Sequence, residues 1–65
     1  MHLEVNGTRH RVQAPDLAAL LVELGFDDRA VATALDGAFV PAALRGSTPL
    51  VPGARVEVLA PMQGG

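Results

Sequence analysis

Apolar and polar residues alternate over residues 1–5, and Asn6-Gly7 separates this run from a second short segment, residues 8–12. Alternation with a period of two predicts β-strands, and Asn-Gly between two such runs is typical of a two-residue hairpin turn. Such a loop fixes the register, so residues 1–5 are expected to pair with residues 8–12. The expected facing pairs are Val5 with Thr8, Glu4 with Arg9, Leu3 with His10 and His2 with Arg11. The opposite charges of Glu4 and Arg9 favour this register.

After Ala14-Pro15 the apolar period changes to that of a helix. Leucines at i, i+3, i+4 and i+7 form one stripe, made of Leu17, Leu20, Leu21 and Leu24. Asp16 is a suitable N-cap, and Gly25 stands where a left-handed residue ends a helix. Phe26 is placed to contact Leu21 in a Schellman motif. A helix of about nine residues is not stable alone, so we expect the leucine stripe to pack against a sheet.

Shorter segments complete the expected fold. They are a strand at 31–35 closed by the turn Asp36-Gly37, a short apolar piece at 39–40, one helical turn at 42–44, and a last strand at 55–60 with Val56 and Val58 inward. The order hairpin, helix, strand, short strand, connector, strand predicts an α+β fold of the β-grasp kind. It has a mixed sheet of four to five strands, with one main helix on one face. The inward valines place the last strand between the hairpin and the strand at 31–35. We therefore expect a domain over residues 1–60 and a flexible tail over residues 61–65.

Composition removes several classes of function. The chain has 65 residues, 5 Lys plus Arg against 7 Asp plus Glu, a net charge of −2 and no cysteine. Scattered arginines without Trp or Tyr argue against nucleic-acid binding. The longest apolar run, residues 17–22, is far shorter than the ~20 residues of a membrane span, and the first residues do not resemble a signal peptide, so we expect a cytoplasmic protein with no membrane partner.

Internal catalytic or metal sites are not indicated either. His2 and His10 fall on opposite faces of the expected hairpin, so they cannot share a metal without breaking the register. Ser47 and Thr48 lack a nearby histidine and are interpreted as loop or cap residues. We expect no bound cofactor and no metal.

The remaining candidate is the carboxyl-terminal segment Pro61-Met62-Gln63-Gly64-Gly65. Glycine lacks Cβ, so Gly64 and Gly65 can enter a narrow channel in a partner. An α-carboxylate, ionised at neutral pH, can attack the α-phosphorus of a nucleotide, and a sulfur nucleophile can then displace AMP to leave a thiocarboxylate.

Several segments together resemble the ThiS-type sulfur carriers of thiamine (thiazole) biosynthesis, ubiquitin-like β-grasp proteins that end in Gly-Gly. They are Val5-Asn6-Gly7, the run from Val31 to Gly37 followed by Val40-Pro41, Thr48-Pro49-Leu50 with Gly53, Val56-Glu57-Val58, and Gln63-Gly64-Gly65. The resemblance covers essentially the whole chain. It implies a carrier that is a cosubstrate and not an enzyme.

The same resemblance implies the partners. A ThiF-like adenylating enzyme would activate Gly65 with ATP and magnesium, a cysteine desulfurase would supply sulfur, and a ThiG-like thiazole synthase would receive it. The implied partner surface is the sheet face opposite the helix, where the strand alternation places Ala32, Ala34, Glu57 and Leu59, together with Met62 and Gln63 of the tail.

Alternatives stay open on the sequence alone. The chain is also compatible with a sulfur carrier for another pathway, such as molybdopterin or amino-acid sulfur transfer, or with a ubiquitin-like protein modifier. The remaining alternative is a plain β-grasp domain that only binds other proteins.

Overall fold

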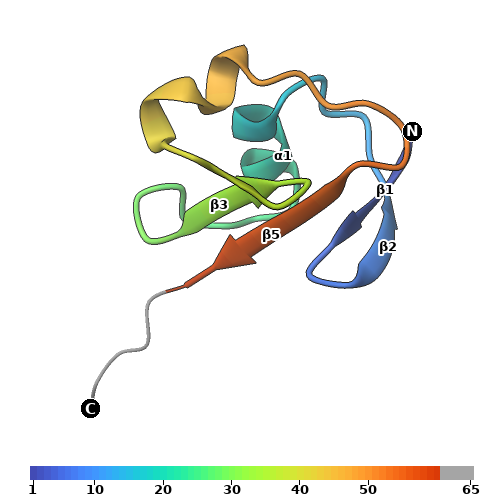
Figure 1. The fold of residues 1–65 in the computed structure, drawn as a ribbon, viewed down its shortest axis with the longest axis horizontal. Coiled ribbons are helices and arrows are strands. Elements are labelled where there is room, and N and C mark those ends of the chain that lie inside the picture. Colours follow the sequence, from blue (N-terminus) through green and yellow to red (C-terminus); the bar gives the residue numbers. More distant parts are fainter. Residues whose placement is uncertain (61–65) are drawn as a thin grey trace.

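The computed structural model describes residues 1–60 and has a single five-stranded sheet with one α-helix packed on it (Figure 1). The elements are β1 (His2–Val5), β2 (Thr8–Arg11), α1 (Leu17–Glu23), β3 (Ala32–Leu35), β4 (Ala38–Val40), the 3₁₀ helix η1 (Ala42–Ser47) and β5 (Arg55–Leu59). The strand order is β2-β1-β5-β3-β4, so the last strand lies between the hairpin and β3 as predicted. β1 and β5 run parallel, whereas the other neighbours are antiparallel. The α+β fold expected from the sequence is confirmed.

The first hairpin has the predicted register, with all four expected pairs between β1 and β2. Asn6 and Gly7 both take positive φ angles, 52° and 82°, which is the geometry of a type I′ turn. The strands are one residue shorter at the open end than predicted. Hydrogen bonds still join Met1 and Val12 there, because each backbone nitrogen donates to the other residue's carbonyl over 2.8 Å.

Glu4 has an arginine opposite it on each side. Glu4 faces Arg9 on β2, but it also faces Arg55 on β5. Its carboxylate forms the ion pair with Arg55, with 3.6 Å between Oε2 and Nε. The predicted position of Arg9 opposite Glu4 is confirmed, and the structure adds the ion pair with Arg55. Since both side chains of this pair are exposed, it adds little stability.

Helix α1 begins and ends as the sequence predicts. The Asp16 carboxylate accepts a hydrogen bond from the Ala19 backbone over 2.8 Å. At the other end Gly25 has φ of 80° and its N–H bonds to the Val22 carbonyl, while the Phe26 N–H bonds to the Leu21 carbonyl. These two bonds define a Schellman motif. The helix has seven residues, slightly fewer than expected, because Leu24 already serves as its C-cap.

The leucine stripe and the inward valines meet in one core. Leu17, Leu20 and Leu21 are completely buried, and Val56 and Val58 of β5 face them from the sheet. The full buried apolar set is Leu3, Val5, Val12, Ala14, Leu17, Leu20, Leu21, Val40, Leu50, Ala54, Val56 and Val58. Within residues 1–60, no helix is both long and apolar enough to cross a membrane.

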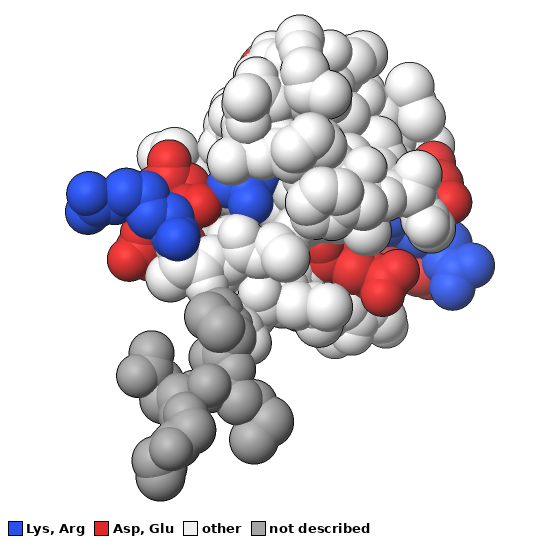
Figure 2. All heavy atoms as spheres, turned by 60° about the vertical axis from the view of Figure 1, so that its left-hand side comes forward, with Lys and Arg blue, Asp and Glu red and all other residues white. Residues whose placement is uncertain are grey.

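Element η1 is longer than the single turn predicted at 42–44, and it contains a buried arginine. Arg45 is only 5% exposed, and its guanidinium donates to the Thr33 hydroxyl and to the carbonyls of Asp28 and Val31. Ser47 and Thr48 both donate to the Leu44 carbonyl, which confirms them as cap residues. Arg45 is the one charged residue between positions 37 and 54, so the exposed residues of η1 are uncharged. Figure 2 shows a broad uncharged upper surface, with the charged side chains lying across the middle of the molecule and at its sides.

Candidate functional site

Four of the predicted partner-binding residues come together on strands β3 and β5. Ala32 lies opposite Leu59, and Ala34 lies opposite Glu57, in adjacent antiparallel pairs. The four residues therefore form a continuous area across β3 and the second half of β5. The structure brings them together as the strand alternation predicted.

The residues between these two pairs, Thr33 of β3 and its strand neighbours, show which way this area faces. Thr33 of β3 pairs with Val40 on one side and with Val58 on the other, and all three side chains are buried. Since successive residues of a strand point to opposite faces, Ala34 and Leu59 point away from α1. Leu59 is 62% exposed in consequence.

Sequence reasoning missed an aromatic residue on the same face. Phe39 of β4 lies opposite Ala34 and is 70% exposed. The signal that locates it is its neighbour Val40, whose inward position requires Phe39 to point outward. We define the open sheet face as Ala32, Ala34, Phe39, Glu57 and Leu59.

Charged residues border the open sheet face on the hairpin side. Arg55 precedes Glu57 by two positions on β5, so it points to the same side, where it pairs with Glu4. The face is thus apolar over β3, β4 and the end of β5, and charged toward β1. An apolar centre with a polar rim is the usual arrangement of a protein–protein interface.

A shallow hollow lies where β5 ends. Its lining is formed by the loop before β3 and the last residues of the sheet, namely Arg29, Ala30, Val31, Ala32, Leu59 and Ala60. The remaining predicted site residues Met62, Gln63, Gly64 and Gly65 lie outside the described residues. The open sheet face consequently borders the point where the chain continues toward Gly65.

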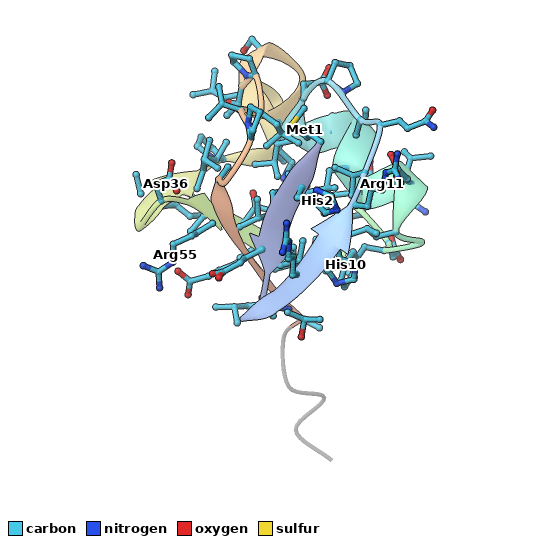
Figure 3. The ribbon with its side chains drawn as sticks, turned by 90° about the vertical axis from the view of Figure 1, so that its right-hand side faces the viewer. Met1, His2, His10, Arg11, Asp36 and Arg55 are labelled. Carbon is cyan, nitrogen blue, oxygen red and sulfur yellow. The ribbon has the colours of Figure 1, made fainter. Side chains whose placement is uncertain are left out.

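The histidines are not brought together. His2 lies opposite Arg11 and is exposed, whereas His10 lies opposite Leu3 and is partly buried at the edge of the sheet (Figure 3). The two side chains therefore point to opposite faces, as the register predicted. In residues 1–60 no group of three or more His, Asp or Glu side chains is arranged to hold a metal ion.

Comparisons with known proteins agree on one family. The model of the ThiS family matches residues 3–65. A crystal structure of the thiamine biosynthesis protein ThiS from Geobacter metallireducens superposes with a TM-score of 0.86 and 29% identity, covering the whole of both chains. An NMR structure of a thiamine biosynthesis protein from the same organism has a TM-score of 0.80 and 29% identity, and covers all of this chain and 88% of the other. No curated protein matches this sequence.

Proposed function

The chain belongs to the ThiS family of small sulfur carrier proteins, and from this membership we propose that its Gly65 carboxylate carries sulfur for thiazole formation in thiamine biosynthesis. The observation that carries this proposal is the family match, which extends from residue 3 through Gly64 and Gly65. The fold supports it, since β5 is the central strand and leads directly toward these glycines.

The first chemical step is adenylation of the carboxylate. A carboxylate oxygen of Gly65 attacks the α-phosphorus of ATP, a new P–O bond forms, and pyrophosphate leaves. The product is a mixed anhydride, in which the carbonyl has become an electrophile. Magnesium and ATP are bound by the activating enzyme, and the carrier supplies only the nucleophilic oxygen.

The second step replaces oxygen by sulfur. Hydrosulfide attacks the carbonyl carbon of the anhydride, the bond to AMP breaks, and a thiocarboxylate remains on Gly65. A persulfide from a cysteine desulfurase gives an acyl disulfide instead, and a thiol must then cleave its S–S bond to leave the thiocarboxylate. The absence of a Cβ at Gly65 keeps the carbonyl open to either attack.

The protein is accordingly a cosubstrate, and the catalytic groups belong to its partners. They are a ThiF-like adenylating enzyme, the sulfur donor and a ThiG-like thiazole synthase as acceptor. We place these reactions in the cytoplasm, where ATP is available.

The open sheet face is proposed as the docking surface for the adenylating enzyme. Leu59 and Phe39 give it an apolar centre, and Glu57 gives it a charged rim. Met62 and Gln63 are proposed to extend the contact along the segment that leads to Gly65. Extended chain spans at most about 3.5 Å per residue, so the five residues after Ala60 reach ~17 Å from the sheet.

Intact-mass measurement tests the proposal. The purified chain is incubated with a ThiF-like enzyme, ATP, magnesium and a sulfide source, and the expected product has gained the mass difference between sulfur and oxygen at Gly65. Omission of sulfide should leave the adenylate. A chain that lacks Gly65 is the control and should show neither product. A wild-type chain that is never adenylated would contradict the proposal.

A further inference from the structure

Strand β5 has more main-chain groups facing β1 than β1 can pair. The parallel pairing covers only two positions, Glu4 with Arg55 and Val5 with Val56. The Asn6 N–H still donates to the Val56 carbonyl over 2.9 Å. At Asn6 and Gly7 the chain then turns away into β2, so the main chain of β1 does not reach Val58.

The Asn6 side chain takes the place of the missing strand. Its Oδ1 accepts a hydrogen bond from the Val58 N–H over 2.8 Å, and its Nδ2 donates to the Val58 carbonyl over 3.0 Å. A carboxamide has the same donor and acceptor as a peptide group. The side chain therefore adds one more rung to the parallel ladder, between residues 52 positions apart in sequence.

This rung lies at the functional end of β5. Val58 is the last buried residue of the strand, and Leu59 of the open sheet face follows it directly. Figure 3 shows the β1–β2 turn beside the end of β5. On its other edge this end of β5 pairs with β3, where Leu59 lies opposite Ala32. The two contacts together hold the last residues of β5 from both edges of the strand.

We propose that Asn6 is a positioning residue for the carrier reaction: by holding both backbone groups of Val58, its side chain fixes the end of β5, from which the chain continues to the Gly65 carboxylate that the adenylating enzyme must receive. This inference rests on the proposed function. It assigns to the hairpin turn a role beyond reversing the chain. Asn6 acts through Val58 and touches no reacting atom.

The chain offers a matched control at the opposite end of the same strand. Asp36 also has a positive φ, 49°, and is also followed by a glycine in a hairpin turn. Its Oδ1 accepts a hydrogen bond from the Arg55 N–H over 2.9 Å, so it holds the start of β5 (Figure 3). Replacement by glycine suits both positive-φ positions, because it removes the side chain and keeps the turn.

The test compares Asn6→Gly with Asp36→Gly in two measurements. Amide hydrogen exchange is expected to accelerate at Val58 in the first variant and at Arg55 in the second. In adenylation by a ThiF-like enzyme, kcat/KM for Asn6→Gly should fall about tenfold. The reason is that even a small displacement of a reacting group, here the Gly65 carboxylate, from its productive position slows the reaction. Asp36→Gly should keep the kcat/KM of wild type, because the hydrogen bond that it loses lies at the start of β5 and not at its end.

The outcomes separate the two proposals. Wild-type activity in Asn6→Gly, or an equal loss in Asp36→Gly, overturns the positioning role and leaves the carrier function intact. Unchanged exchange at Val58 in Asn6→Gly overturns it as well. A wild-type chain that is not adenylated overturns the carrier function itself, and the role of Asn6 falls with it.

Discussion

The guanidinium Nε of Arg45 donates a hydrogen bond to the Thr33 hydroxyl over 3.0 Å, and both side chains are buried. The Thr33 hydroxyl in turn donates to the Val40 carbonyl over 2.8 Å. The other guanidinium nitrogens bond to the carbonyls of Asp28 and Val31 over 2.7 Å each. One side chain therefore connects η1 to β3 and to the loop that precedes it.

Replacing Arg45 by alanine is expected to destabilise the fold by about 2–4 kcal/mol, because charge-assisted hydrogen bonds are lost and the carbonyls they satisfied are left without donors. Arg45→Lys should fall between alanine and wild type, since an ammonium cannot reproduce the planar fork of donors. Urea unfolding measures the difference. The control is Arg29→Ala, an exposed arginine whose loss should change stability by no more than about 0.5 kcal/mol. Equal effects of Arg45→Ala and Arg29→Ala would contradict the structural role.

The leucines under the sheet are expected to be the most sensitive apolar positions. Leu20→Ala or Leu21→Ala should cost about 2–5 kcal/mol by leaving a cavity in the core, a large part of the stability of a small domain. Val22 is their neighbour on the same helix and is 77% exposed, so Val22→Ala should stay within about 0.5 kcal/mol. Thermal unfolding gives the melting temperature of each of the three variants for comparison. A core leucine variant that melts with wild type would be incompatible with this packing.

The features that the sequence predicted correctly are those that interactions between residues close in sequence determine. The register of the first hairpin followed from the two-residue turn at Asn6-Gly7, and both ends of α1 followed from Asp16 and Gly25. Alternation along β5 then placed Val58 in the core and Leu59 outside it. These features depend on residues a few positions apart, so the sequence contains the information directly.

Contacts between distant segments were beyond reach of the same reasoning. Glu4 has two arginines opposite it, and only the parallel pairing with β5 reveals that Arg55 forms the ion pair. The burial of Arg45 depends on a loop carbonyl contributed by Asp28, 17 positions away. The bond between Asn6 and Val58 likewise requires the first and last strands to be adjacent. The sequence placed the last strand beside the hairpin, but it did not give the register between them, on which such partners depend.

The open sheet face is expected to be a binding surface and not a part of the core. Leu59→Glu and Phe39→Glu should each weaken binding to a ThiF-like enzyme at least about fivefold, since a buried apolar anchor is commonly worth 1 kcal/mol or more. Both side chains are exposed, so the melting temperature should change little. Val22→Glu, on the opposite side of the molecule, is the control and should bind normally. Titration calorimetry decides between the outcomes: undiminished affinity in both face variants would place the interface elsewhere.

Tail glycines are expected to govern activation without affecting the fold. The five strands and the buried core described above are formed by residues 1–60, so deleting Gly65, or Gly64 and Gly65 together, should leave the melting temperature unchanged and abolish adenylation. Gly64→Val should also slow adenylation, because a β-branched side chain both fills a narrow channel and restricts the backbone of the segment that enters it. Gly64→Ala adds a single methyl group and should have a smaller effect. Rapid-quench measurement of AMP transfer separates these variants, and if Gly64→Val reacted at the wild-type rate, the carboxylate would reach ATP through an open surface and not through a channel.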